Sequence, residues 1–446
     1  MRDKKATVVG LARSGVGAAN LLLSLGADVT VTDMKSEPEL AGQLSRLAPG
    51  VKRALGGHPE QLFFGADIVV ISPGVPMAAG PVARAIEAGV EVIGELELAY
   101  QVSGSPFIAI TGTNGKSTTT TLVGEMLKKA GMKAYVGGNL GNALTDEPLM
   151  LAGQDYIVAE VSSFQLEAVR SFRPSISAVL NLTQDHMDRY SGMDEYTAAK
   201  ARVFMNQVEG DLLVLNADDP PTLALKDKAR CPVALFSRKL EVGRGVYAVG
   251  GRVFAATSGV DPRELIPVAG IRIKGAHNLE NALAAAAISL AAGAPPDAVA
   301  DVLREFPGLE HRTEFVRTLD GITYINDSKG TNVGAVEKSL EGFDEPVILI
   351  AGGLDKHSDF SPLAGLIRRR VKRLILIGSA AGVMEDALGR ETSTVKAGGL
   401  EEAVALARDA GSPGDVVLLS PACASFDMFK DFEDRGRQFK ELVNNL

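Results

Sequence analysis

The sequence predicts a mixed α/β protein of three domains, because strands rich in Val and Ile alternate with helical segments and this alternation restarts twice along 446 residues. The first series opens with ATVV, a helix from about residue 15 to 24, and the strands DVTVTD and DIVVIS. The second opens at PFIAIT, and the third opens at ITYIN after a Pro-Gly break at residues 307–308. Such near-continuous apolar strands are typical of parallel sheets covered by helices.

The restarts divide the chain into predicted domains at residues 1–94, 95–306 and 307–446. A chain of this length corresponds to roughly two to four domains of about 100 to 200 residues each. In the second domain, a shorter and Gly-rich strand series at residues 236–273 predicts a small β-sheet beside the parallel one. An Ala-rich helix is expected at residues 278–292.

Composition excludes several classes of protein. The net charge of −9 argues against broad electrostatic binding to nucleic acid. No window approaches the roughly 18 apolar residues of a membrane span, and the N-terminus runs straight into a strand. Cys231 and Cys423 stand far apart without a CxxC pattern, which predicts neither a disulfide framework nor a zinc site. We therefore expect a cytoplasmic monomer with no nucleic-acid or membrane partner.

The segment TGTNGKST, residues 111–118, follows an apolar strand and precedes a helical pattern. In such a unit, backbone N–H groups and the helix N-terminus face an anion, and glycines let the chain wrap a polyphosphate closely. By position, Lys116 is expected at the β and γ phosphates of ATP, and the Ser117 hydroxyl is expected to bind Mg²⁺. Ile110 replaces the first Gly of the G-x-x-x-x-G-K-[ST] pattern. The alternative is a plain glycine turn.

Two further positions follow apolar strands, where open α/β sheets place their ligands. Glu160 ends the strand YIVAE, and a Mg²⁺ carboxylate is the expected role. His186 lies in NLTQDHMDRY with Asp185 and Asp188 beside it. The alternative for His186 is a capping or salt-bridged loop.

Lys200, in EYTAAKARVF, is predicted by periodicity alone to be a surface lysine of a helix. Chemistry offers a second role, because burial lowers the pKa of a lysine and an uncharged amine can take up CO₂. The resulting carbamate is an anion that can bind Mg²⁺, whereas an ammonium would repel the ion. The sequence leaves both interpretations open.

Nine segments resemble, in order, those of the Mur ligases of peptidoglycan assembly: GTNGKST, EVSSFQLE, NLTQDHMDRY, YTAAKARVF, AHNLENALAA, GLEHRTEFV, NDSKGTNVGA, AGGLDKHSDF and LSPACASFDMF. The resemblance covers essentially the whole chain. The last four segments are most similar to the members that add D-glutamate to UDP-N-acetylmuramoyl-L-alanine. The resemblance implies an ATP-dependent amide ligase that uses two Mg²⁺ ions and an acyl-phosphate intermediate. It implies a Rossmann-like UDP-binding domain, a P-loop ATPase-like central domain and a Rossmann-like C-terminal domain.

The resemblance assigns the first domain to the UDP-linked precursor. The contacts that it implies are Arg13, Ser14, Asp33, Lys35, Gly74, Asn139 and His186. Ala12 replaces the middle Gly of a dinucleotide fingerprint at residues 10–15, which disfavours NAD because that Gly normally lets the pyrophosphate approach. Met34 stands where a polar residue is expected, and its thioether cannot hydrogen-bond as a hydroxyl would. The alternative for the glycines of both loops is an ordinary turn.

For ATP and the metal, the resemblance implies the phosphate loop and several polar residues downstream. The ATP contacts are Gly112, Thr113, Asn114, Gly115, Lys116, Ser117, Thr118, Asn278, Asn281, Arg312, Asp327 and Lys329. The catalytic set is Lys116, Glu160, His186 and carbamylated Lys200, and the metal ligands are Ser117, Glu160, His186 and Lys200. Asn278 and Asn281 lie three apart on one helix face, where their amides could read the adenine edge. For Asn278 the alternative is a helix N-cap.

For D-glutamate, the resemblance implies residues on loops after strands of the third domain. They are Thr331, Lys356, Ser425, Phe426 and Phe432. A dianionic amino acid needs cations and hydroxyls, which several of these side chains supply. The alternatives are core positions for the two phenylalanines and a surface position for Lys356.

The sequence also admits three rival functions. The nearest is a ligase of the same architecture with another amino acid, or a folylpolyglutamate synthase-like ligase. The second is an oxidoreductase that depends on the loop at residues 10–15 and on Asp33. The third is a nucleotide-binding module without catalysis.

Overall fold

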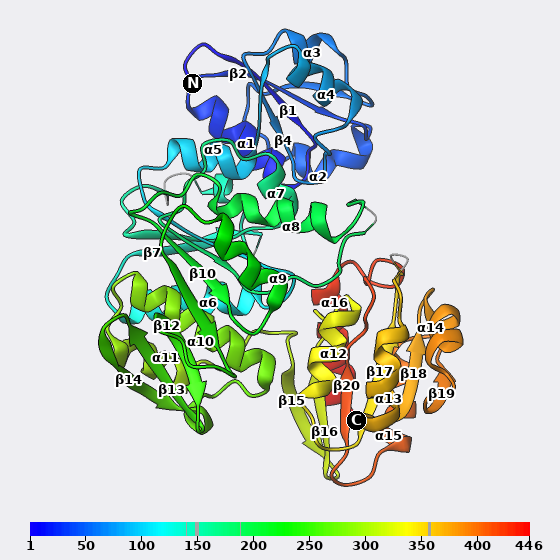
Figure 1. Cartoon of the computed structure of the whole chain (residues 1–446). Helices are drawn as coiled ribbons and strands as arrows, with labels where there is room; N and C mark the ends of the chain where they lie inside the picture. Colours follow the sequence, from blue (N-terminus) through cyan, green and yellow to red (C-terminus); the bar gives the residue numbers. More distant parts are fainter. Residues whose placement is uncertain (140, 148–150, 188, 356–357) are drawn as a thin grey trace. The chain divides into compact units, whose positions relative to one another are not determined.

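The computed structural model describes residues 1–139, 141–147, 151–187, 189–355 and 358–446 (Figure 1). The chain divides into two compact units. The first contains residues 1–182, 192–268 and 281–303, and the second contains residues 183–191, 269–280 and 304–446. The described strands form three sheets, each largely or wholly parallel, so the predicted α/β class is confirmed. The three domain boundaries drawn from the sequence remain a prediction.

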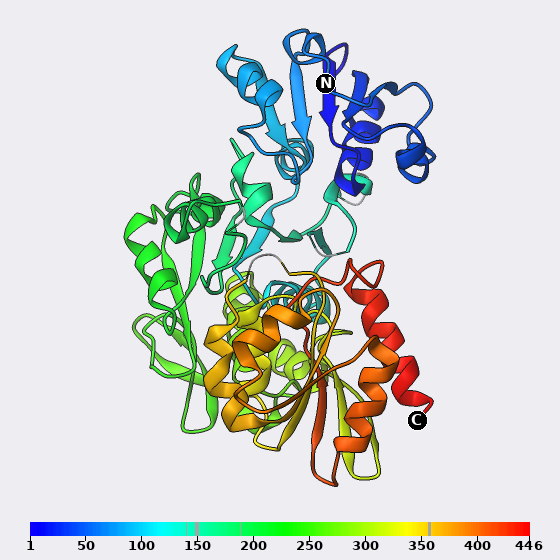
Figure 2. The ribbon, with the colours of Figure 1, turned by 90° about the vertical axis from the view of Figure 1, so that its right-hand side faces the viewer.

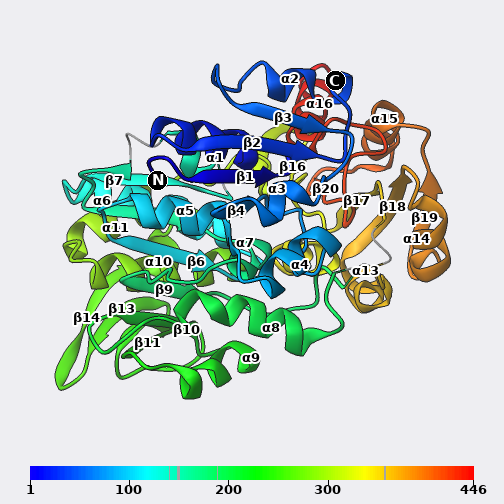
Figure 3. The same cartoon turned by 90° about the horizontal axis from the view of Figure 1, so that it is seen from above.

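The N-terminal sheet is wholly parallel, with strand order β3-β2-β1-β4-β5. Its strands are β1 (Lys5–Val9), β2 (Asp28–Asp33), β3 (Lys52–Leu55), β4 (Ile68–Ile71) and β5 (Glu91–Gly94). Helices α1 (Arg13–Ser24) and α2 (Ala41–Leu44) pack on one face, and α3 (Gln61–Phe64) and α4 (Gly80–Glu87) pack on the other. Figure 3 shows β1, β2 and β3 side by side. The strand order reverses between β1 and β4, so a ligand crevice is expected at their carboxyl ends.

The central sheet has nine strands among the described residues, in the order β14-β13-β12-β11-β10-β9-β6-β8-β7. Its strands are β6 (Phe107–Thr111), β7 (Ala134–Gly138), β8 (Tyr156–Glu160), β9 (Ile176–Val179), β10 (Leu212–Asn216), β11 (Val233–Ser237), β12 (Gly245–Val249), β13 (Arg252–Thr257) and β14 (Val260–Pro267). The strands expected as a small β-sheet are β12 to β14, which pair antiparallel and continue the same sheet through the parallel pair β11–β12. The order reverses between β6 and β9, which places a second crevice after β6.

Helices flank this sheet and connect its strands. They are α5 (Glu95–Val102), α6 (Lys116–Lys129), α7 (Ser163–Glu167), α8 (Met193–Ala201), α9 (Pro220–Leu223), α10 (Ala276–Ala291) and α11 (Pro296–Glu305). The strands β6 and β10 are buried at every residue, which explains their continuous apolar sequences. The Ala-rich helix predicted at residues 278–292 is α10 and begins two residues earlier.

The C-terminal sheet has six strands among the described residues, in the order β15-β16-β20-β17-β18-β19, and is parallel except for β15. The strands are β15 (Glu314–Leu319), β16 (Ile322–Asn326), β17 (Val347–Gly352), β18 (Val371–Ile377), β19 (Ser393–Lys396) and β20 (Val416–Leu419). Helices α12 (Val333–Glu341), α13 (Ala364–Arg370) and α14 (Ala381–Leu388) pack on one face, and α15 (Leu400–Ala410) and α16 (Phe432–Asn444) pack on the other. Figure 2 shows α16, in red, beside α15. Because β16, β20 and β17 are adjacent and parallel, the loops that follow them lie side by side at the carboxyl edge of the sheet.

Glu97 is a carboxylate of α5 with no exposed surface. It accepts hydrogen bonds from the backbone N–H groups of Arg170, Ser171 and Phe172 at 2.8, 2.9 and 3.0 Å. Burial raises the pKa of Glu97, but the hydrogen bonds, led by that from the Ser171 hydroxyl, outweigh burial and lower the pKa overall. The carboxylate therefore joins α5 to the segment that follows α7.

Replacing Glu97 by Ala leaves three backbone N–H donors without their acceptor, the Phe172 N–H in a buried position and the other two in partly buried positions. We expect the free energy of unfolding to fall by about 3 kcal/mol or more, since each unsatisfied donor costs roughly 1 to 3 kcal/mol. Because the native pKa is lowered, this stabilisation is present above the ordinary pKa of 4.5 and is lost as the pH falls through the native value. Denaturant unfolding at neutral and acidic pH measures both effects. Glu91→Ala is the control, because the Glu91 side chain is 37% exposed, and equal losses in the two variants would contradict the prediction.

Candidate active site

Residues 111–118 join β6 to α6, as the sequence predicts. Gly112 and Gly115 have φ angles of +150° and +85°, which favour glycine. A Cβ on Gly115 would lie 2.1 Å from Asn281 Oδ1, so no side chain fits there. Gly115 is the left-handed residue immediately before α6, whose first N–H groups have no acceptor within the helix. The loop therefore has the geometry of an anion-binding turn.

Asn181 fixes the loop from the end of the neighbouring strand β9, although the sequence did not single it out. Its carbonyl oxygen accepts from Thr113 N at 2.9 Å, and its Oδ1 accepts from Asn114 N at 2.8 Å. Its Nδ2 returns a hydrogen bond to Asn114 O at 3.0 Å. These bonds define the backbone path of the loop.

Two lysines converge on the carbonyl oxygen of Gly112. Lys116 Nζ and Lys200 Nζ each donate to it at 2.9 Å, and Lys116 also donates to Thr113 O at 2.8 Å. Lys200 is only 2% exposed, so the surface-lysine interpretation is wrong. The two ammonium nitrogens lie no more than about 6 Å apart, and at an effective dielectric constant of about 20 their repulsion is about 3 kcal/mol or more. The arrangement favours an anion at this point.

Tyr196, one turn before Lys200 on α8, is a second residue that the sequence did not single out. Its hydroxyl lies 3.2 Å from Thr113 Oγ1, and Lys200 Nζ lies 4.7 Å from the centre of its ring. Tyr196 is 1% exposed. It therefore orients both the loop and the lysine.

Glu160 ends β8 beside the phosphate loop, because it pairs in register with Ile110 of β6. It is 2% exposed, and its Oε1 accepts from Asn139 Nδ2 at 2.7 Å. Its Oε2 is buried and has no hydrogen-bond partner among the described residues. This unsatisfied carboxylate oxygen is of the kind that a hard cation such as Mg²⁺ prefers. The neighbouring phosphate loop carries the buried Ser117 hydroxyl, a second oxygen of a suitable kind.

The structure thus brings together the loop, Asn139, Glu160, Lys200 and Asn281 in the first compact unit. His186 belongs to the second unit. It has a φ of +57°, its backbone N–H donates to Asp185 Oδ1 at 2.9 Å, and its Nε2 lies 3.7 Å from Asp185 Oδ2.

Five of the residues expected at the UDP-linked precursor, Arg13, Ser14, Asp33, Lys35 and Gly74, lie at the carboxyl edge of the N-terminal sheet, whereas Asn139 follows β7 of the central sheet. Asp33, the last residue of β2, accepts from Leu11 N at 2.7 Å and from Lys35 N at 2.9 Å, which ties the loops after β1 and β2 together. The other members, Arg13, Ser14 and Gly74, follow β1 and β4 at the point where the strand order reverses. Met34 is 67% exposed.

The polar residues expected at ATP in the second unit are Asn278, Arg312, Asp327 and Lys329. Asn278 lies inside the first turn of α10 and donates to Lys274 O at 2.9 Å, so the N-cap alternative is wrong. Asp327 is buried and accepts from Ser339 Oγ and Ser420 Oγ at 2.6 and 2.7 Å. Burial raises the pKa of Asp327, partly offset by these bonds and by the charge of Arg312.

The D-glutamate candidates lie on the loops after β16 and β20 and at the start of α16. Lys329 Nζ lies 3.6 Å from the centre of the Phe432 ring, a cation–π contact. Ser425 is buried, whereas Phe426 is 69% exposed, so a core role for Phe426 is wrong. Thr331 N donates to Lys329 O at 2.8 Å. Lys356 lies outside the described residues.

Arg435 of α16 is a fully buried cation that the sequence did not single out. Its Nε and one terminal nitrogen donate to Ser328 Oγ and Ser328 O at 2.9 and 2.8 Å. It also donates to Cys423 O at 3.3 Å and Ala424 O at 3.4 Å. Burial lowers the pKa of Arg435 to about 10, so it stays charged at neutral pH. It therefore joins the loops after β16 and β20.

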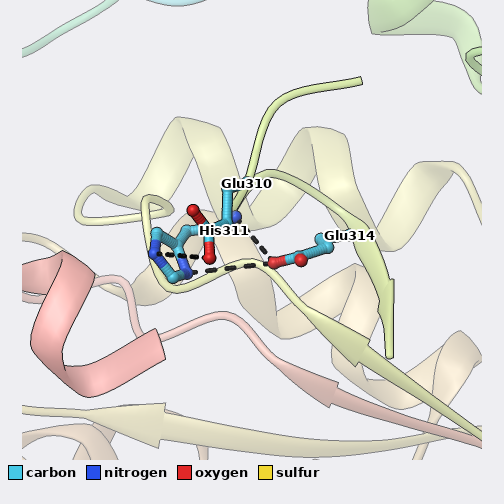
Figure 4. A group of neighbouring side chains, drawn as sticks. All are labelled: Glu310, His311 and Glu314. Atoms are coloured by element: carbon cyan, nitrogen blue, oxygen red, sulfur yellow. Dashed lines mark hydrogen bonds and ion pairs between the residues drawn. The ribbon is translucent and has the colours of Figure 1, made fainter. Parts of the chain in front are cut away.

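Glu310, His311 and Glu314 form a cluster with the spacing of metal ligands (Figure 4). Lys440 already pairs with both glutamates, reaching Glu314 Oε1 at 3.0 Å. Asn326 Nδ2 lies 2.9 Å from His311 Nδ1. An ammonium takes the place of a metal ion here, so we interpret the cluster as structural.

Among the described residues, no helix is both long and apolar enough to span a membrane.

Three family models match the chain in order. Residues 4–94 match the MurD-like N-terminal domain of Mur ligases, residues 110–289 match the Mur ligase middle domain, and residues 311–423 match the Mur ligase glutamate ligase domain.

Close relatives match along the whole chain. A protein of Pelotomaculum thermopropionicum named UDP-N-acetylmuramoylalanine--D-glutamate ligase is 48% identical, and the match covers 99% of this chain and 98% of the relative. A protein of Pelobacter propionicus with the same name is 47% identical, with 100% of both chains covered.

Solved structures show the same fold at low identity. A pseudomurein peptide ligase type C from Methanothermus fervidus has a TM-score of 0.64 at 19% identity, covering 99% of this chain and 100% of that one. The ligase MurF from Thermotoga maritima, in complex with ADP, has a TM-score of 0.62 at 14% identity, covering 100% and 96%.

Replacing Arg435 by Met removes the cation that joins the two loops. We expect the free energy of unfolding to fall by about 3 kcal/mol, because several buried carbonyl and hydroxyl groups lose their donor. We also expect faster amide hydrogen exchange in residues 327–331 and 420–425. Arg437→Met is the matched control, since the Arg437 side chain is 53% exposed. Identical exchange in both variants would show that Arg435 does not hold the loops.

Proposed function

The chain belongs to the Mur ligase family, and from that premise we propose that it uses ATP to join D-glutamate to UDP-N-acetylmuramoyl-L-alanine. The names of relatives at 47 to 48% identity along the whole chain support this choice of substrates. The structural observation that carries the proposal is the phosphate loop, with two lysines on Gly112 O and the buried Glu160 carboxylate on the adjacent strand. These groups suit the transfer of a phosphoryl group from ATP.

The chemistry starts from a carboxylate, which is a poor acceptor for an amine. The alanyl carboxylate attacks the γ-phosphorus of ATP, the bond to the β–γ bridging oxygen breaks, and ADP leaves with its electron pair. Lys116 and the N–H groups of the loop stabilise the negative charge of the transferring group. The amine of D-glutamate then attacks the acyl phosphate, loses a proton, and phosphate leaves as the amide forms.

Ser117, Glu160, His186 and carbamylated Lys200 are the residues proposed to hold two Mg²⁺ ions. The free Oε2 of Glu160 supplies an oxygen of the kind that Mg²⁺ prefers. When bound, Mg²⁺ neutralises charge on the phosphates.

The crowding of charge at Gly112 supports the proposal that Lys200 is carbamylated. The uncharged amine adds CO₂ and releases a proton, which replaces a buried cation by an anion. This change turns the repulsion between Lys116 and Lys200 into attraction. The modified nitrogen would lie beside the Tyr196 ring, whose centre is 4.7 Å from Lys200 Nζ.

The amino-acid site is proposed on the third domain. Lys329, Thr331 and Ser425 lie on loops of the same sheet edge, and they supply the cation and hydroxyls that a dianionic amino acid needs. Lys356, Phe426 and Phe432 complete the proposed site. Asn278, Asn281, Arg312 and Asp327 are proposed at ATP. We further propose that the enzyme acts as a monomer in the cytoplasm, where ATP is supplied.

The decisive experiment is an amino-acid panel. With ATP and UDP-N-acetylmuramoyl-L-alanine, we expect phosphate release to depend on D-glutamate and to be at least about 100-fold slower with L-alanine or a diamino acid, because a site built for a dianion rejects amino acids that leave its groups unpaired. Equal turnover with L-alanine or a diamino acid would refute the assignment of substrate. Intact ATP in every mixture would instead favour the non-catalytic module.

Lys200→Ala should lower kcat/KM by about 100-fold, or about 2.7 kcal/mol. Added acetate or propionate should recover part of the activity, because a small carboxylate can take the position of the carbamate. Lys226→Ala, at an exposed helical lysine, is the control and should keep wild-type activity. A folded Lys200→Ala variant that no carboxylic acid rescues would count against the carbamate.

A further inference from the structure

The short helix η2 (Leu144–Asp146) packs directly against helix α1. A Cβ on Gly17 of α1 would lie 2.6 Å from Asp146 Oδ1 and 2.7 Å from Thr145 Oγ1. The backbone nitrogen of Asp146 would lie 3.0 Å from the same Cβ, so an added side chain requires η2 to shift. Gly17 follows Arg13 by one helical turn, so the contact lies on the face of α1 that carries Arg13.

Glu95, the first residue of α5, holds the same turn. It is 2% exposed, and its Oε1 accepts from Thr145 N at 2.9 Å and from Thr145 Oγ1 at 3.1 Å. Its Oε2 is buried and, among the residues that the structure describes, has no hydrogen-bond partner. The proposed mechanism gives this buried carboxyl group no part.

Glu95 lies near charged residues that include Arg13, which is expected to contact the UDP-linked precursor. Burial raises the pKa values of Glu95 and Asp146. Hydrogen bonds from Thr145 offset part of the increase at Glu95, the charge of Arg46 offsets part of the increase at Asp146, and the guanidinium of Arg13 makes a smaller contribution to both. Arg46 lies 3.9 Å from Asp146 Oδ1. A raised pKa means that Glu95 keeps its proton over a wider pH range, which agrees with an Oε2 that has no donor beside it.

The η2 turn also belongs to the connection that carries Asn139. Gly138 N donates to Asn142 O at 3.0 Å, and Asn142 Nδ2 donates to Glu147 Oε1 at 2.6 Å, so this connection is braced on both sides of η2. Asn139 itself donates to Glu160 at 2.7 Å. The η2 turn therefore contacts α1, which begins at Arg13. It also lies in the same connection between strands as Asn139.

We propose that Glu95 is a positioning residue for the UDP-linked precursor: by holding Thr145, it fixes the η2 turn against α1 and so sets Arg13 and Asn139 at their working separation. The inference rests on the proposed function, because the precursor is the ligand that both residues are expected to contact. Glu95 touches no reacting atom. Its loss should therefore weaken precursor binding and leave ATP binding unchanged.

The test compares Glu95→Ala with Glu95→Gln in the full-length enzyme. Isothermal titration with UDP-N-acetylmuramoyl-L-alanine alone, and steady-state KM values for each substrate, are the measurements. We expect Glu95→Ala to raise the precursor Kd and KM at least tenfold while the KM for ATP stays within twofold. Glu95→Gln should remain within threefold of the wild type, because the amide oxygen still accepts from Thr145 and the amide group resembles a protonated carboxyl.

Gly17→Ala tests the same contact from the other side, and it applies even if Glu95→Ala does not fold. Its Cβ should displace η2 and weaken precursor binding at least tenfold. Gly42→Ala is its matched control, because a Cβ there meets none of the described atoms within 4 Å. The inference would be overturned if Glu95→Ala or Gly17→Ala left the affinity for the precursor unchanged, or if either weakened ATP binding as much as precursor binding. It would also be overturned if Glu95→Gln bound the precursor as weakly as Glu95→Ala. A wild type that neither binds nor converts the precursor would overturn the proposed function instead.

Discussion

The carbonyl oxygen of Gly112 is the point on which the site depends, because lysines from two helices donate to it. Lys116 comes from the first turn of α6 and Lys200 from the last turn of α8, and both donate at 2.9 Å. Two ammonium groups this close repel each other, and negative charge placed beside them reduces that repulsion. Polyphosphate and a carbamate are both anions that can supply this charge.

The parallel sheets bring the groups of each site together. In each sheet the strand order reverses near the loops that carry the predicted ligands, so side chains far apart in sequence leave adjacent strands at one edge. Glu160 stands beside the phosphate loop because β8 pairs with β6, and the loops of Ser328 and Ser425 meet because β16 pairs with β20. The topology thus sets the distances before any side chain makes its contacts.

Four buried ionisable side chains, Glu97, Arg435, Glu160 and Glu95, are of two kinds. Glu97 and Arg435 have their hydrogen-bonding groups satisfied by backbone and hydroxyl partners, so their charges stabilise loops. Glu160 and Glu95 each keep one buried oxygen without a partner among the residues described. An unsatisfied group of this kind is costly, and it is retained where a ligand or a proton can satisfy it. The first of these two oxygens suits a metal ion, and the second suits a proton.

The α/β class, the phosphate loop at residues 111–118 and the position of Glu160 at a strand end could all be predicted from the amino-acid sequence, because each depends on a local pattern of strand, turn and helix. The sequence left Lys200 open between surface and site, since periodicity does not show which face of a short helix is covered. The hydrogen bonds made by Asn181, Tyr196 and Arg435 join residues 67, 83 and 107 positions apart. Strand order and helix packing bring such partners together, so they became visible in the folded structure and not before.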